Sequence, residues 1–313
     1  MSNYVKYKYP NKLSIVRFFK DAEGVRKNPI PFHNRYFEKF GDSFSIRIGF
    51  SKHIILSRDN EIAQYILVKN QKNYHKSKFQ SVYLSKYLGK GLLTSDGDFW
   101  LKQRRLIQPA FHKQKMNQLV DNMNITISAE LDNLGEEKPI DLFPIMSNLA
   151  FNVVAKSLFQ LETAEDKFER IKFIIEEVQH FLIKEIRLPH KAWWFSLSGQ
   201  VKRHLRLAEE NNSIIREIIE ERKASKEEIN DLLNMLLETR YEDTGESMSV
   251  EQLIDEIKVL FIAGHETTAN ALTFTLHLLG SNLEVQEKVF EEIYEIESQT
   301  ENVIEQLQKM TYL

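Results

Sequence analysis

The stretch Val259-Leu-Phe-Ile-Ala-Gly-His-Glu-Thr-Thr-Ala-Asn270 places small and polar residues at the centre of a long apolar run. Ser249 with Gln252 three residues later is a capping-box signature, and Gly280 marks an expected end. The sequence therefore predicts a buried helix from about Val250 to Leu279, roughly 45 Å long at 1.5 Å per residue. A glycine inside a helix costs up to about 1 kcal/mol relative to alanine, and glutamate is rarely buried without a partner. Such residues at this place indicate either that another group packs closely against the helix or that the helix takes part in chemistry.

Three structural alternatives compete with a functional interpretation of this stretch. Gly264 allows another helix to cross closely, without any further role. Thr267 can donate a hydrogen bond back to the Ala263 carbonyl and bend the helix. His265 and Glu266 can form a satisfied polar pair at the surface. We assign His265 no functional role.

Two other functions are excluded by the same residues. The zinc protease motif His-Glu-x-x-His needs a second histidine one turn later, and position 269 is alanine. A membrane span is excluded because Lys258, His265, Glu266 and His277 interrupt the apolar run.

Composition narrows the class of protein. The 313 residues are 42% hydrophobic and 28% charged, as in an ordinary globular protein. The net charge of −3 argues against nucleic-acid binding as the main role. No cysteine is present, which excludes disulfides and thiolate metal sites within these residues. Met1–Lys20 has no apolar stretch of signal-peptide or anchor length, so we expect a cytoplasmic protein without a transmembrane anchor.

The chain before the central helix predicts a mainly α fold with a small β-sheet near the N-terminus. Residues 1–28 are expected to form an N-terminal tail, and Pro29–Pro31 an extended entry into one domain spanning 29–313. Ser43–Ile48 and His53–Ser57 predict a β-hairpin. Phe79–Leu88 predicts a short helix or loop, and 188–199 a loop. Further helices are expected over about 32–40, 59–68, 96–108, 115–134, 141–159, 166–186, 200–223, 229–241 and 283–298.

A second motif is Gly91-Leu-Leu-Thr-Ser-Asp-Gly-Asp-Phe-Trp-Leu-Lys-Gln-Arg-Arg-Leu-Ile-Gln-Pro-Ala-Phe-His112. Asp96 is the expected N-cap of a helix that Pro109 ends. Trp100 and Arg104 are four residues apart and lie on one helix face. This face offers an indole N–H and a forked guanidinium, which together suit a carboxylate. The structural alternative is a Trp–Arg cation–π pair at the surface.

The two motifs, in register about 160 residues apart, resemble those of cytochrome P450, the haem-thiolate monooxygenases. Ala263-Gly264-His265-Glu266-Thr267-Thr268 is similar to the distal-helix signature of that family. Trp100 and Arg104 match its haem-propionate motif, and the order of expected elements from about Pro29 to Leu313 matches its layout.

The resemblance implies a haem b cofactor (iron protoporphyrin IX), bound by Trp100 and Arg104 and covered by Leu92, Ala263 and Gly264. Leu93 falls where the family contacts substrate. Thr267 is implied to hydrogen-bond the oxygen bound at the haem, and Glu266 to link a water there to bulk solvent as a proton source. The haem itself carries the oxygen chemistry, and the protein supplies orientation, protons and a dry pocket.

The sequence departs from the family after the central helix. The family's Glu-x-x-Arg helix and its cysteine ligand to the iron are both missing, so no metal ligand is assigned here. We interpret the chain as the N-terminal three quarters of such an enzyme, a truncated fragment. Thiolate ligation drives O–O cleavage, so the chain alone is not expected to be active.

Two functional hypotheses remain open on the sequence. The first is a monooxygenase that inserts one atom of O2 into a hydrophobic small molecule, such as a fatty acid or a terpenoid. Its electrons would come from a separate ferredoxin or flavin reductase. The second is a non-catalytic helical binding protein derived from the same fold.

Overall fold

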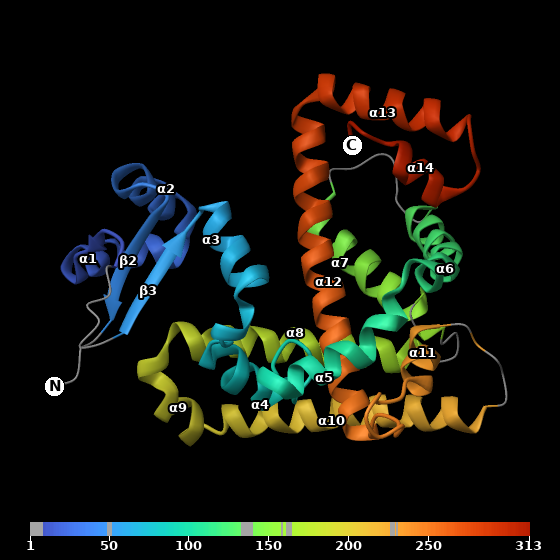
Figure 1. Ribbon diagram of the computed structural model, residues 1–313, viewed down its shortest axis with the longest axis horizontal. Coiled ribbons are helices and arrows are strands. Elements are labelled where there is room, and N and C mark those ends of the chain that lie inside the picture. The colour runs from blue at the N-terminus through green and yellow to red at the C-terminus, as the bar shows by residue number, and fades with distance from the viewer. Residues whose placement is uncertain are drawn as a thin grey trace. The chain divides into compact units, whose positions relative to one another are not determined.

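The computed structural model describes residues 9–48, 52–132, 140–157, 159–160, 165–225, 229 and 231–313. The described residues are mainly helical, with a small sheet near the N-terminus, as the sequence predicts (Figure 1). By its contacts the chain divides into two compact units, Met1–His75 and Lys76–Leu313.

The first unit packs two helices with the sheet. Strand β2 (Ser43–Ile48) pairs in parallel with β1 (Lys12–Leu13) and antiparallel with β3 (Lys52–Ser57), which confirms the expected hairpin. The helices are α1 (Ile15–Lys27) and α2 (Pro29–Phe40). Its buried apolar side chains are Leu13, Phe32, Tyr36, Phe44 and Ile46. The unit ends with α3 (Asn60–Gln64), the π-helical turn η1 (Tyr65–Lys69) and the 3₁₀ turn η2 (Gln71–Asn73).

Two local expectations for the start of the chain are corrected. Residues 12–27, which lie within the expected tail, form β1 and α1, because Leu13 is buried and its strand pairs with β2. Pro29 is not an extended entry but the first residue of α2, where a missing N–H costs nothing. The side chain of Asn28 caps this helix by accepting a hydrogen bond from the Ile30 N–H at 3.1 Å.

The second unit is helical. The first segments are η3 (Phe79–Leu84), α4 (Ser85–Leu88), α5 (Gly97–Ile107), η4 (Gln108–Phe111), α6 (Lys113–Asp132), α7 (Leu142–Asn152) and η5 (Val153–Ser157). They are followed by α8 (Glu165–Arg187), η6 (Pro189–Lys191), α9 (Ala192–Leu197), α10 (Gln200–Ala224) and α11 (Leu232–Glu238). The last are α12 (Val250–Ser281), α13 (Leu283–Glu297) and α14 (Val303–Lys309).

Most expected helices are confirmed, and three details differ. Residues 188–199 are not a plain loop, because they contain α9, whose Phe195 is buried. The α-helix α5 ends at Ile107, as the proline at 109 predicts, but the chain continues as the 3₁₀ segment η4, which contains Pro109. Gly280 lies inside α12, which continues to Ser281.

Helix α12 organises the second unit. Its first half lies in the main core, where Phe261 stacks with Phe151 of α7 at 5.6 Å and with Phe159 at 5.0 Å between ring centroids. Figure 1 shows α12 running from the end of the unit near α10 and α11 to α13. The helix therefore crosses the whole unit, as its length predicts.

Candidate active site

The exposed side of α12 carries the residues that the sequence singles out. Ala263, Thr267, Ala271, Phe274 and Leu278 recur every three to four residues, so they form one stripe along the helix. All five are exposed, and Phe274 and Leu278 expose 64% and 59% of their surface. A stripe of small and apolar side chains facing outwards is suited to a flat, apolar partner.

Thr267 donates a hydrogen bond to the backbone carbonyl of Ala263 at 2.5 Å, as one structural alternative expected. This bond uses the hydroxyl proton and leaves the oxygen lone pairs free to accept a hydrogen bond from a water or ligand. Glu266 is exposed beside it. The pair thus places an acceptor oxygen and a solvated carboxylate next to the stripe.

Gly264 and His265 face the protein interior instead. A Cβ at Gly264 would lie 2.8 Å from the Val154 side chain of η5, so the glycine permits close helix packing. His265 is buried, and its Nε2 lies 2.8 Å from Ser147 Oγ of α7. The surface His265–Glu266 pair that the sequence allowed is therefore wrong. Burial, with a smaller contribution from the nearby Lys172 cation, lowers the pKa of His265 and favours the neutral ring.

The motif on α5 forms a cation–π pair. The Arg104 guanidinium lies 5.2 Å from the centre of the Trp100 ring, and the Lys76 ammonium lies 5.5 Å from the same ring. Arg104 is exposed, so its fork remains accessible to a carboxylate. Asp96 does not cap α5 with its side chain, which accepts a hydrogen bond from the Lys76 N–H at 3.2 Å.

The segment that carries Leu92 and Leu93 is bound to α12. Glu256 accepts a hydrogen bond from the Leu92 N–H at 2.8 Å, and the Leu92 carbonyl accepts one from Lys76 Nζ. Leu92 packs partly buried against the main core, and Leu93 is partly exposed. Lys76 thus bridges Trp100 of α5 and the segment held by α12.

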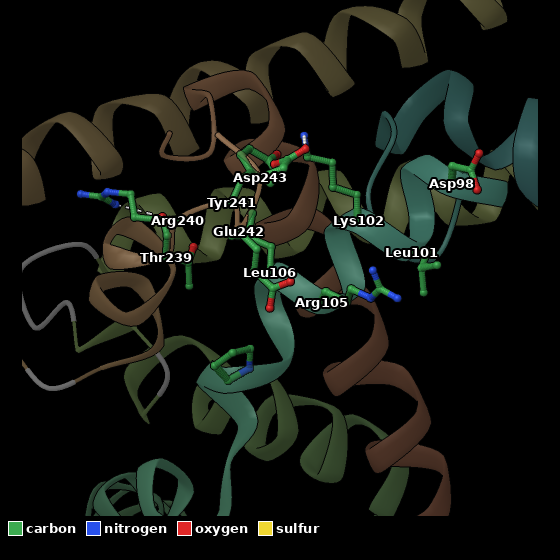
Figure 2. Close-up of a pocket in the computed structure, with 11 residues that line it drawn as sticks. Asp98, Leu101, Lys102, Arg105, Leu106, Thr239, Arg240, Tyr241, Glu242 and Asp243 are labelled. Atoms are coloured by element: carbon green, nitrogen blue, oxygen red, sulfur yellow. Dashed lines mark hydrogen bonds and ion pairs between the residues drawn. The ribbon is translucent and has the colours of Figure 1, made fainter. Parts of the chain in front are cut away.

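A cavity of about 550 Å³ lies on another side of α5. It is lined by Asp98, Lys102 and Arg105 of α5 and by the segment 239–243, and Figure 2 shows Lys102 reaching towards Asp243, 3.0 Å away. Trp100 and Arg104 do not line it. This cavity is therefore separate from Trp100, Arg104 and the stripe of α12.

Comparison with known proteins decides the family. The sequence profile "Cytochrome P450" matches residues 8–313. The chain belongs to the cytochrome P450 family. Cyclooctatin synthase of Streptomyces melanosporofaciens is 30% identical over 261 residues, which cover 82% of this chain and 56% of that protein. Cyclooctat-9-en-7-ol 5-monooxygenase of the same organism is 28% identical over 273 residues (87% and 59%). Echinocystic acid 23-monooxygenase of Saponaria officinalis is 28% identical over 295 residues (85% and 56%).

Solved structures agree on the cytochrome P450 fold. Retinoic acid-bound cyanobacterial CYP120A1 superposes with a TM-score of 0.70 at 22% identity, covering 90% of this chain and 62% of that one. The cytochrome P450DA heme domain gives 0.70 at 21% identity, with coverages of 84% and 57%. The chain thus spans less than two thirds of the relatives and structures it matches here.

The family implies a haem, and the described residues fit one in two respects. The outward stripe of α12 offers small side chains at Ala263 and Thr267, where a flat macrocycle needs room. Arg104 offers an accessible guanidinium, and the Lys76 ammonium lies over the same Trp100 ring. These two cations suit the anionic propionate edge of a haem. Among the described residues there is no cluster of metal-ligating side chains and no helix long and apolar enough to cross a membrane.

Three residues of this region were not found by reading the sequence. Lys76 lies outside both sequence motifs. Glu256 is buried two turns before Ala263, and His265 occupies a motif position without an expected role. A charged residue at a core position of a helical pattern was the only signal for Glu256.

Proposed function

We propose that this chain forms the distal part of a haem-dependent monooxygenase, which inserts one atom of O2 into a hydrophobic organic substrate. The observation that carries the proposal is the outward stripe of α12, with Thr267 and Glu266 at its centre, in a chain of the cytochrome P450 family. When bound, haem b supplies the oxygen-activating chemistry.

The proposed roles of the residues follow from their exposure and bonding. Trp100 and Arg104 would bind a haem propionate. Ala263 would leave room for the ring, and Leu92 would cover it. Gly264 contributes by letting α12 pack closely against η5, rather than by direct contact. Leu93 would contact substrate.

Thr267 and Glu266 would handle protons. Because the Thr267 hydroxyl proton is held by the Ala263 carbonyl, its Oγ1 is free to accept from a water and fix that water at the stripe. Glu266 is exposed and can exchange protons between bulk solvent and such a water. Together the two side chains can deliver protons to one place on the stripe.

The substrate class and partners are part of the same proposal. The relatives' names specify cyclooctat-9-en-7-ol and echinocystic acid as substrates of those enzymes. We infer a hydrophobic small molecule for this protein, with electrons from a separate ferredoxin or flavin reductase. A cytoplasmic location stays a prediction of the sequence.

The test is a carbon monoxide difference spectrum of the reduced protein. Residues 1–313 contain no cysteine, so the chain alone should give no thiolate-type red-shifted band, and histidine is its strongest available ligand. Co-expression with a cytochrome P450 C-terminal segment that carries the ligand cysteine should produce that band. Absence of haem uptake in both samples would favour a non-catalytic binding protein, and a thiolate band from the chain alone would contradict the proposal.

A further inference from the structure

We propose that Glu256 is a positioning residue, which with Gln252 and Asp255 seats the loop Gly89–Ser95 on α12 and so fixes Leu92 and Leu93 beside the stripe. That the loop borders a substrate site rests on the proposed function. The seating itself rests only on contacts within the chain.

Side chains of α12 hold the loop backbone at successive groups. Asp255 accepts a hydrogen bond from the Lys90 N–H at 2.7 Å, and Glu256 accepts one from the Leu92 N–H at 2.8 Å. Gln252 Nε2 donates to the Lys90 carbonyl at 3.0 Å and to the other Glu256 oxygen at 2.8 Å. The two carboxylates and the amide thus fix the loop's backbone rather than its side chains.

The loop also fits its seat sterically. A Cβ added at Gly91 would lie 2.8 Å from the Asp255 carbonyl oxygen and 2.8 Å from the Val259 side chain. At Gly89, whose φ of +74° already favours glycine, a Cβ would overlap the Asp255 carboxylate. Both glycines therefore allow the backbone to approach α12 closely.

The two ends of the loop are fixed independently. Before it, the Tyr87 hydroxyl of α4 donates to Glu185 of α8 at 2.6 Å. Within it, Thr94 Oγ1 donates to the Gly89 carbonyl at 2.6 Å, which closes the loop into a compact turn. Leu92 and Leu93 lie between these anchors, where the α12 contacts and the hydrogen bond from Lys76 to the Leu92 carbonyl fix the backbone.

Helix geometry places the seat next to the candidate site. Glu256 and Ala263 are seven residues apart, so they share a helix face, roughly 10 Å apart along the axis. The loop therefore covers the beginning of the face on which the stripe continues. A loop at that place forms one wall of any pocket over Ala263 and Thr267.

Glu256 gives the seat a dependence on pH. Its side chain is 1% exposed, and burial raises its pKa to about 7, against the hydrogen bonds from Leu92 and Gln252. The charged groups that act on it are Asp255 on its own helix and Lys76. If the loop leaves, Glu256 meets water and its pKa falls towards the ordinary value of 4.5. Raising the pH through 7 therefore favours the released loop. The equilibrium constant for release should rise about ten-fold between pH 6 and pH 8.

The experiment is amide hydrogen exchange on residues 1–313 without haem, expressed as protection relative to the unstructured peptide at each pH. The Leu92 amide should lose about ten-fold in protection from pH 6 to pH 8. Glu256→Gln should make the protection of Leu92 independent of pH. Glu220→Gln, the same change at an exposed site on α10, should keep the parent profile.

Gly91→Ala provides a second test that leaves the carboxylates intact. The added methyl group should displace the loop and lower the protection of Lys90 and Leu92 while the core of α12 stays protected. A flat profile in the parent, a profile unchanged by Glu256→Gln, or full protection of Leu92 in Gly91→Ala would overturn the proposal. Failure of haem uptake would refute the proposed function and leave this result standing.

Discussion

The two halves of α12 differ in what surrounds them. From Leu253 to Phe261 most residues are buried and contact the loop before α5, α10 or the aromatic core. From Ala263 onwards only His265 and Ala269 are buried, on the side packed against α7. One continuous helix thus serves first as a core element and then as an exposed surface. Apolar residues of one helix therefore differ in role: those of the first half pack the core, and Phe274 and Leu278 of the second half face outwards.

The largest expected effect is a difference in unfolding free energy between matched substitutions in the two halves of α12. Phe261→Ala removes a side chain that is 1% exposed and stacked on two aromatic rings, so it should lower the free energy of unfolding by about 3–5 kcal/mol. Phe274→Ala, the same change at 64% exposure, should cost less than about 0.5 kcal/mol. Denaturant unfolding of residues 1–313 measures both. Equal losses would show that the exposed half is packed as well.

The next effect tests the buried carboxyl of the first half. Burial raises the pKa of Glu256 from 4.5 to about 7 in the native state. Between pH 4.5 and pH 7, this side chain is therefore protonated in the native state and ionised in the unfolded state. The contribution of Glu256 to the unfolding free energy should therefore be highest below pH 4.5 and fall by roughly 3 kcal/mol as the pH rises through 7. Glu256→Gln should remove that part of the fall, and Glu220→Gln should not. The measurement is denaturant unfolding across pH 4.5–8, and a Glu256→Gln profile that matches the parent would contradict the assignment.

A smaller effect concerns haem binding by the Trp100–Arg104 pair of α5. In protein co-expressed with the cysteine-bearing C-terminal segment, Trp100→Ala and Arg104→Ala should each weaken haem retention about ten- to a hundred-fold, because a charge-assisted hydrogen bond is worth about 1.5–3 kcal/mol. Arg105→Ala, on the side of α5 that lines the separate cavity, serves as the control. Haem content after extensive washing reports the result. Equal haem in all four proteins would favour a surface cation–π pair with no ligand.

Local patterns predict much of the fold. Ser249 does cap α12, through a hydrogen bond from the Gln252 N–H at 3.2 Å, and Asp59 and Asp141 cap the helices that follow them. The hairpin was predictable because its strands lie next to each other in the sequence. Each of these features is determined by residues a few positions apart.

The candidate site was predictable only where a motif repeats a family pattern. Glu256 bonds Leu92 across 164 positions, and His265 bonds Ser147 across 118. Such contacts leave no periodic signal, so neither partner could be read from the sequence. Gln252 was expected to return its side chain to the helix start, but it reaches the Lys90 carbonyl and Glu256 instead. This amide thus links the loop backbone to Glu256, whose buried carboxyl group needs hydrogen-bond donors.

The smallest expected effect on stability is at Thr267. This residue lies at the centre of the proposed oxygen-activating face, the exposed half of α12. Thr267 is exposed, so Thr267→Val should change the unfolding free energy by less than about 0.5 kcal/mol. Among the described contacts its side chain bonds only to the backbone carbonyl of Ala263.

The direct measurement is the yield of oxygenated product per reductant consumed, in haem-loaded protein co-expressed with the cysteine-bearing C-terminal segment. Thr267→Val keeps the shape of the side chain and loses the hydroxyl, so reductant should still be consumed while peroxide replaces most of the product. Thr267→Ser keeps the hydroxyl and should retain most of the parent's yield. Equal yields in the parent and Thr267→Val would contradict the claim.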